Sequence, residues 1–281
     1  MTAPVDPSSS TPTAVPRPLR AVAFDLDGTL YLGSEVVPGA AEIVAHVRES
    51  GLGVLFLTNT TTRNPRQLQE RLASLGIAAA YAEIYSSGTA AARYVAQRGH
   101  TVAYVVGSEG IRGEVIAHGL RVTARGNDAQ ALVVGFVAEF DATTLPDGLP
   151  PECEFVAANL DRDYPLEGGA RLPGCAQTVA RVATRLGRDY DFCAGKPGTY
   201  MLECVERDLG LAPGEIVVVG DSVESDVAMA RAAGCRSILI AAQGGGDGGA
   251  SAAVSRLTDL PAALEALTGR GGARLPAGSP P

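Results

Sequence analysis

The sequence predicts an α/β protein with a Rossmann-like core, in which helices cover both faces of a doubly wound parallel sheet. Short apolar runs that end at polar or glycine residues, at 21–24, 52–57 and 215–219, are typical of buried parallel strands. Segments with helical spacing separate these runs, and regular alternation of strands and helices produces a parallel sheet. A long insertion between the two halves of this pattern predicts a second, inserted α/β domain.

The first half of the core contains two strands and two helices, each with a recognisable end. The unbroken apolar run 21–24 is a buried strand. From 38 to 50, apolar residues recur at helical spacing and a glycine follows. The run 52–57 is the second strand. The second helix begins at Asn64-Pro65, a typical cap and first residue, and ends at Leu75.

The second half of the core repeats the same alternation. An apolar strand at 215–219 ends at Gly220-Asp221-Ser222, and a helix follows from about 225 to 233. The run 237–240 is the next strand. A short final helix opens with a proline and occupies 261–267. These elements complete the core sheet and its covering helices.

The inserted domain has strands and helices of its own. The stretch between Thr58 and Lys196 is several times longer than one βαβ unit, which takes roughly 30 residues. Strands are predicted at 101–106, 131–136 and 155–158, and a helix at 108–118. A segment with three prolines, 141–151, is predicted to be irregular.

These elements divide the chain into two domains and two tails. The core is discontinuous and comprises residues 19–84 and 179–268, and the inserted domain occupies 85–178. The segments 1–18 and 269–281 lack apolar periodicity and are expected to be disordered tails. Residues 1–18 also lack the apolar centre of a signal peptide.

The composition excludes several function classes. The net charge is −8 and there is no basic run, so nucleic-acid binding has no electrostatic support. No stretch approaches the roughly 20 apolar residues that cross a bilayer, so we expect no membrane partner. The five cysteines form no close pair in sequence, which favours reduced thiols and a cytoplasmic location.

Four polar segments stand where predicted core strands end or helices begin: 25–29, 58–59, 195–197 and 220–226. We expect them to meet, because the carboxyl ends of parallel strands face one edge of a sheet. Asp25 and Asp27 share a face of the extended chain, and two such close carboxylates favour a hard cation such as Mg²⁺ between them. The alternative is that they only cap the next segment.

The lysine in the third segment is the only lysine in the chain, because arginine supplies every other cationic side chain. A position that keeps lysine indicates a need for a compact ammonium, although chance is the alternative. Together, the four segments contain the nucleophile, the acid and the cation that phosphoryl transfer from a monoester requires.

In this order, the segments resemble the four motifs of the haloacid dehalogenase superfamily of phosphotransferases, and the resemblance covers roughly residues 20–265. It implies that Asp25 is the nucleophile that forms an aspartyl-phosphate. It further implies that Asp27 is the general acid and then the base. The phosphate-binding residues would be Thr58, Asn59 and Lys196.

The resemblance also implies a Mg²⁺ site. Its ligands would be Asp25, the backbone carbonyl of Asp27, and Asp221, with Asp226 orienting Lys196 or the water ligands of the metal. From the residues alone, Asp226 could equally be a carboxylate that interacts favourably with a helix N-terminus. Thr58 and Asn59 could be an ordinary strand-end hydroxyl and an ordinary helix cap.

The position of the insertion identifies a branch of the superfamily. The chain between Asp27 and Thr58 has room for one helix and one strand only, which argues against the sugar phosphomutase branch with its early helical cap. The sequence resembles the NagD-type, p-nitrophenyl phosphatase and phosphoglycolate phosphatase-like group in segments 105–110, 157–161 and 195–197. By this resemblance the inserted domain is a substrate-covering cap.

Two departures from that group limit what can be transferred from it. Leu160 stands where proline is common, and 221–226 varies the usual fourth motif. Neither departure changes a residue with a chemical role. Both weaken the argument for assigning the substrate of any member of that group to this chain. The residues expected to select the substrate lie in the cap: Asn159, Asp161, Arg162, Asp163 and Tyr164.

The sequence therefore predicts a Mg²⁺-dependent phosphatase that hydrolyses a small organic phosphate monoester through a phosphoaspartate. Phosphoglycolate, glycerol phosphate, sugar phosphates and pyridoxal phosphate remain candidate substrates. Two alternatives stay open: a phosphotransferase that uses an organic acceptor, and a non-catalytic regulator that binds phosphometabolites. A homodimer formed through the cap is also expected.

Overall fold

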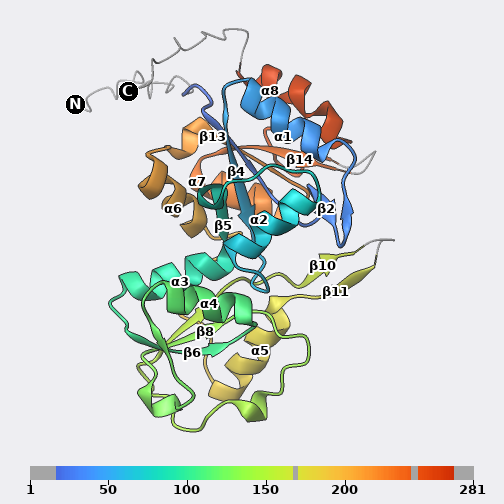
Figure 1. Ribbon diagram of the computed structural model, residues 1–281. Helices are drawn as coiled ribbons and strands as arrows, with labels where there is room; N and C mark the ends of the chain where they lie inside the picture. Colours follow the sequence, from blue (N-terminus) through green and yellow to red (C-terminus); the bar gives the residue numbers. More distant parts are fainter. Residues whose placement is uncertain (1–16, 167–169, 242–245, 269–281) are drawn as a thin grey trace, which may run out of the picture.

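The computed structural model describes residues 17–166, 170–241 and 246–268, and within them it confirms the α/β class. Two parallel sheets, each flanked by helices, lie one above the other (Figure 1). The tails predicted at 1–18 and 269–281 lie almost entirely outside the described residues. Among the described residues, no helix is long and apolar enough to cross a membrane.

The core sheet has six strands, and every neighbouring pair is parallel. In spatial order the strands are β15 (Ala252–Val254), β14 (Arg236–Ile240), β13 (Ile216–Gly220), β1 (Ala21–Phe24), β4 (Gly53–Thr58) and β5 (Ile84–Ser86). In the middle of the sheet, Phe24 lies opposite Phe56 of β4 and Val219 of β13. The residues that follow these three strands therefore meet at one edge of the sheet.

Alternate residues of β1 are buried on opposite faces of this sheet. Ala21 and Ala23 pack in one hydrophobic cluster, whereas Val22 and Phe24 pack in another. The first cluster includes side chains from α6 (Tyr200–Leu209) and α7 (Ala228–Ala233). The second includes side chains from α1 (Ala40–Glu49), α2 (Pro65–Ser74) and α8 (Leu260–Thr268). Burial on both faces explains why these strands read as continuous apolar runs.

The second sheet has five strands, again all parallel. In spatial order they are β12 (Phe192–Cys193), β9 (Glu154–Ala157), β8 (Ala131–Val134), β6 (Val102–Val106) and β7 (Arg121–Val122). One face packs against α3 (Ser87–Gln97) and α4 (Glu109–Ala117), and the other packs against α5 (Cys175–Leu186). We call this second unit the cap.

The strands place the limits of the cap differently from the predicted range 85–178. β5 belongs to the core sheet, and β12 pairs with β9 of the cap sheet, with Phe192 opposite Val156. We therefore propose that the cap comprises residues 87–193. The two-residue strand β12 is too short to be recognised from the sequence, and the predicted range 85–178 was set without it.

Several elements differ from the sequence predictions. The predicted strand 131–136 ends at Val134, and the predicted helix 225–233 begins with a wide turn at Val223–Val227 that leads into α7. Two short antiparallel hairpins were not predicted. They are β2 (Tyr31–Leu32) with β3 (Glu35–Val36), and β10 (Asp163–Pro165) with β11 (Arg171–Pro173). The second hairpin projects from the cap toward the core (Figure 1).

Candidate active site

A cavity of about 500 Å³ lies between the core and the cap, at the carboxyl ends of the central core strands. Asp25 follows β1, Thr58 ends β4 and Asp221 follows β13. The hairpin β10–β11 contributes lining residues from the cap. The structure thus brings together the four polar segments that the sequence singled out, as expected for a ligand site in an open α/β sheet.

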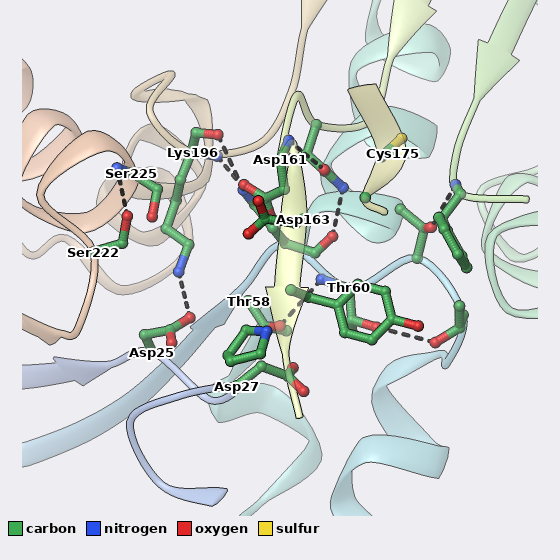
Figure 2. A pocket seen from close by; sticks show the side chains of 18 of the residues that line it. Asp25, Asp27, Thr58, Thr60, Asp161, Asp163, Cys175, Lys196, Ser222 and Ser225 are labelled. Atoms are coloured by element: carbon green, nitrogen blue, oxygen red, sulfur yellow. Dashed lines mark hydrogen bonds and ion pairs between the residues drawn. The ribbon is translucent and has the colours of Figure 1, made fainter. Parts of the chain in front are cut away.

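Lys196 is buried at the base of this cavity, with a relative exposure of 2%. Its ammonium forms an ion pair with Asp25, donates to Oδ1 of Asp226 at 2.7 Å, and donates to the carbonyl oxygen of Leu57 at 3.2 Å. Figure 2 shows the lysine side chain pointing to Asp25, with Asp27 and Thr58 beside it. Burial lowers the pKa of Lys196, but Asp226 and Asp25 raise it further, so the ammonium stays charged.

Three carboxylates lie close together here, and two of them, Asp25 and Asp226, contact the Lys196 ammonium. One oxygen atom from each of Asp25, Asp221 and Asp226 lies within 4.8 Å of the other two. Burial, and then the charges of Asp226 and Asp221, raise the pKa of Asp25, and Lys196 opposes this shift. Burial and the charge of Asp226 raise the pKa of Asp221 to about 6. The cluster therefore holds more negative charge than one lysine neutralises, and its oxygen donors suit a hard divalent cation.

Two glycines allow the carboxylates to approach the backbone. Gly28 has φ of +99°, and a Cβ atom at this position would overlap the Asp221 carboxylate. A Cβ atom on Gly220 would overlap the Asp226 carboxylate. These close approaches, together with the left-handed conformation of Gly28, explain why the motif segments carry glycine at these positions.

Asp27 lies apart from the three clustered carboxylates. Its Oδ2 accepts a hydrogen bond of 3.3 Å from the Tyr31 hydroxyl. Burial raises the pKa of Asp27, and the hydroxyl of Tyr31 and the charge of Arg63 oppose this shift. A raised pKa favours the protonated form of the carboxyl group, which is the form that a general acid needs.

Thr58 is buried at the end of β4, and its Oγ1 accepts a hydrogen bond of 3.1 Å from the backbone N–H of Thr60. Among the residues that the structure describes, none accepts the hydroxyl hydrogen of Thr58. That hydrogen can therefore be donated to a ligand in the cavity.

Asn59 uses its side chain within the protein. The Oδ1 atom accepts from the backbone N–H of Lys196 at 2.8 Å. The Nδ2 atom donates to the carbonyl oxygen of Lys196 at 3.0 Å and to Oδ1 of Asp161 at 2.8 Å. Both amide hydrogens thus have acceptors in the protein, although Asn59 was predicted to bind phosphate.

The cap residues predicted to select the substrate fall into two groups. Asn159, Asp161, Asp163 and Tyr164 line the cavity. Arg162 is exposed and is not among the lining residues, so its position does not support the prediction that it contacts substrate. Tyr164 packs edge-on against Phe136, with 5.8 Å between the ring centroids.

Sequence reasoning missed three arginines that line the cavity: Arg63, Arg71 and Arg171. Arg71 lies over the ring of Tyr31, 5.1 Å from its centroid, and Arg171 pairs with Asp163. Arg63 could have been found from its position, because it follows the polar segment at the end of β4. Arg171 gave no such signal, since it belongs to the hairpin that was not predicted.

Comparison with protein families identifies two matching segments. Residues 22–121 match the model of haloacid dehalogenase-like hydrolases, and residues 193–262 match a second model of hydrolases of the same type. The first segment contains the residues after β1 and β4, and the second contains Lys196, Asp221 and Asp226. The segment between them belongs to the cap.

Individual proteins show the same similarity. Chronophin from Mus musculus is 34% identical over 78% of this chain and 79% of its own length. The structure of a p-nitrophenyl phosphatase from Archaeoglobus fulgidus superimposes with a TM-score of 0.78 at 27% identity, covering 88% of this chain and 100% of that one. A glycerol phosphate phosphatase from Mycobacterium tuberculosis, in complex with magnesium, has a TM-score of 0.69 at 29% identity, covering 79% and 68%.

Proposed function

The chain belongs to the haloacid dehalogenase-like hydrolases, in their NagD and p-nitrophenyl phosphatase branch, and from this premise we propose that it is a Mg²⁺-dependent phosphatase acting through a phosphoaspartate on Asp25. The observation that carries the proposal is the contact of the buried Lys196 ammonium with Asp25 and Asp226, next to Asp221. In this proposal Asp25 is the nucleophile and Lys196 is the cation that neutralises the phosphate, and their contact at one end of the cavity supports both roles.

In the first half of the proposed reaction, a carboxylate oxygen of Asp25 attacks the phosphorus atom of the substrate. The new oxygen–phosphorus bond forms as the ester oxygen–phosphorus bond breaks, and Asp27 gives its proton to the leaving oxygen. Lys196 favours the ionised form of Asp25 and neutralises charge on the phosphoryl oxygens, while the Thr58 hydroxyl donates to one of them.

In the second half, water attacks the phosphorus of the phosphoaspartate. Asp27, now ionised, takes a proton from this water, and the bond between phosphorus and Asp25 breaks to release orthophosphate. Asp25 and Asp27 thereby return to their starting states. The Tyr31 hydroxyl holds the Asp27 carboxyl group in place for both proton transfers.

A divalent cation fits the donor set of this site. Asp25 and Asp221, with the backbone carbonyl of Asp27, would hold Mg²⁺, and Asp226 would orient Lys196, whose ammonium it contacts. The raised pKa values of Asp25 and Asp221 are the electrostatic support for this assignment, because crowded carboxylates are stabilised by a cation. When bound, Mg²⁺ would supply charge neutralisation for the transferring phosphoryl group.

The substrate in this proposal is a small organic phosphate monoester. A cavity of about 500 Å³ is of the size that holds a small metabolite. We propose a cytoplasmic location because all five cysteines are free thiols in the structure. The homodimer through the cap stays a prediction, which size-exclusion chromatography with light scattering would test.

Hydrolysis of p-nitrophenyl phosphate by the wild type and the Asp25→Asn variant tests the proposal. We expect turnover in Mg²⁺, loss of turnover in EDTA with recovery when Mg²⁺ is restored, and no turnover by a folded Asp25→Asn protein. The proposal is wrong if the variant retains wild-type activity.

A further inference from the structure

The side chain of Asn59 contacts both backbone polar groups of one residue, Lys196. The Lys196 N–H donates to Oδ1 at 2.8 Å, and Nδ2 donates to the Lys196 carbonyl oxygen at 3.0 Å. The asparagine amide thus pairs with the lysine backbone much as a neighbouring β-strand would. This contact joins the end of β4 to the segment before α6, two parts of the chain that are far apart in sequence.

Close packing of Gly195 against Asn59 and Ala158 keeps the pairing of Asn59 with Lys196 in one geometry. A Cβ atom on Gly195 would lie only 2.5 Å from Asn59 Oδ1 and 2.6 Å from the carbonyl oxygen of Ala158. Glycine at 195 is therefore what lets the two segments approach. Asn59 itself is buried, with a relative exposure of 8%.

Asn59 also contacts the cap through three hydrogen bonds. Its Nδ2 donates to Asp161 Oδ1 at 2.8 Å. Its backbone carbonyl accepts from Ser87 Oγ at 2.8 Å and from Asn159 Nδ2 at 2.5 Å. Asn59 is thus a point at which the core strand β4, the Lys196 segment and the cap meet.

We propose that Asn59 is a positioning residue, which fixes the backbone of Lys196 and ties it to Asp161 of the cap. The inference rests on the proposed role of Lys196 as the cation that neutralises the phosphoryl group. The lysine side chain is a flexible four-carbon stem. Its ammonium therefore reaches Asp25 and Asp226 reproducibly only if the backbone of Lys196 is also held in place. The side chain of Asn59 has no amide hydrogen left for phosphate, since Lys196 and Asp161 accept both.

This role predicts how an Asn59→Ala variant behaves. A displaced lysine affects the phosphoryl group, which all substrates share, so kcat should fall by a similar factor for an aryl and an alkyl phosphate. We expect a loss of about 10- to 100-fold, as for a misplacement of about 1 Å in an active site. The matched control is Ser87→Ala, which removes a hydrogen bond to the backbone of Asn59 but leaves the side-chain pairing intact. Its kcat should stay within about 2-fold of the wild type.

A binding measurement separates a positioning residue from a phosphate ligand. Orthovanadate, titrated in Mg²⁺, mimics the phosphoryl group without a leaving group. Asn59→Ala should weaken vanadate binding in the wild-type background but should cause no further loss in a Lys196→Ala background, because Asn59 acts through the lysine. An Asn59→Asp variant, which keeps the shape and loses both donor hydrogens, replaces Asn59→Ala if the latter does not fold.

Three results would overturn the inference. They are a wild-type kcat in a folded Asn59 variant, losses that differ strongly between the two leaving groups, and an additional loss of vanadate affinity when Lys196 is already absent. A wild-type protein without any phosphatase activity would instead refute the proposed function, so the two failures are distinguishable.

Discussion

Replacing Lys196 by methionine should lower both stability and turnover. The ammonium is buried and contacts two carboxylates, at 2.7 Å in the case of Asp226. Methionine fills a similar volume but leaves these carboxylates and the nearby Asp221 without a cation. Removing one partner of a buried ion pair costs about 3–5 kcal/mol, and we expect the free energy of unfolding in EDTA to fall by about this amount.

The same change should reduce kcat by about 100- to 1000-fold, which is the typical effect of removing one group that stabilises transition-state charge. Lys196→Arg is the matched control, because it keeps the charge but replaces the compact ammonium by a planar group. We expect the arginine variant to recover part of the stability and little of the activity.

Urea unfolding in EDTA and p-nitrophenyl phosphate turnover in saturating Mg²⁺ measure these two effects. A Lys196→Met variant that loses less than about 1 kcal/mol and keeps more than a tenth of kcat would refute the reasoning. In that case the ion pairs of Lys196 would be neither structurally nor catalytically important.

Two further predictions concern contacts in the cavity, and a third concerns an ion pair between α3 and α6. Asp221→Asn should raise the Mg²⁺ concentration for half-maximal activity by at least about 10-fold. In EDTA the same change should stabilise the protein, because it removes the repulsion between Asp221 and Asp226. An unchanged Mg²⁺ requirement would contradict the assignment of Asp221 as a metal ligand. Tyr31→Phe removes the 3.3 Å hydrogen bond to Asp27. It should slow the hydrolysis of alkyl phosphates more than that of p-nitrophenyl phosphate, because the p-nitrophenolate leaving group needs no proton. Equal slowing would argue against a role of Tyr31 in acid catalysis. The hydrogen bonds from Arg93 lower the pKa of Asp208. This pair should therefore stabilise the fold at pH values above the unfolded carboxyl pKa of about 3.9, and its contribution should be lost as the pH falls below that value. An Arg93→Ala variant with the same acid unfolding curve as the wild type would contradict this.

The core and its motif residues could be predicted because their signals are local. β1, β4 and β13 are buried on both faces, so each is a continuous apolar run that ends at a polar residue. Parallel pairing then brings Asp25, Thr58 and Asp221 to one edge without any knowledge of side-chain contacts. For this reason, the sequence alone was enough to predict that these three side chains lie together in one site.

The contacts of Asn59 could not be predicted in the same way. Its partners, Lys196 and Asp161, are far away in sequence, and their orientation depends on how the cap sits on the core. Taken alone, an asparagine after a strand suggests a helix cap or a ligand for phosphate. The paired hydrogen bonds to one backbone unit become visible only in three dimensions.

The arginines of the cap show a similar limit. In the hairpin, Arg171 of β11 lies opposite Pro165 of β10, and both line the cavity, whereas Arg162 precedes the hairpin and faces solvent. All three residues of β10 line the cavity, so alternation along the strand does not separate the cavity side from the solvent side in this hairpin. Three-residue strands carry too little periodicity to fix this register from the sequence.

The most direct test of the proposed mechanism is to trap the phosphorylated enzyme. Wild-type protein would be mixed with a phosphate monoester and Mg²⁺, quenched in acid within the first turnover, digested and examined by mass spectrometry. The mechanism predicts a phosphoryl group on the peptide that contains Asp25, and its absence in the Asp25→Asn protein. A phosphoryl group on another residue, or none during active turnover, would contradict the central claim that Asp25 is the nucleophile.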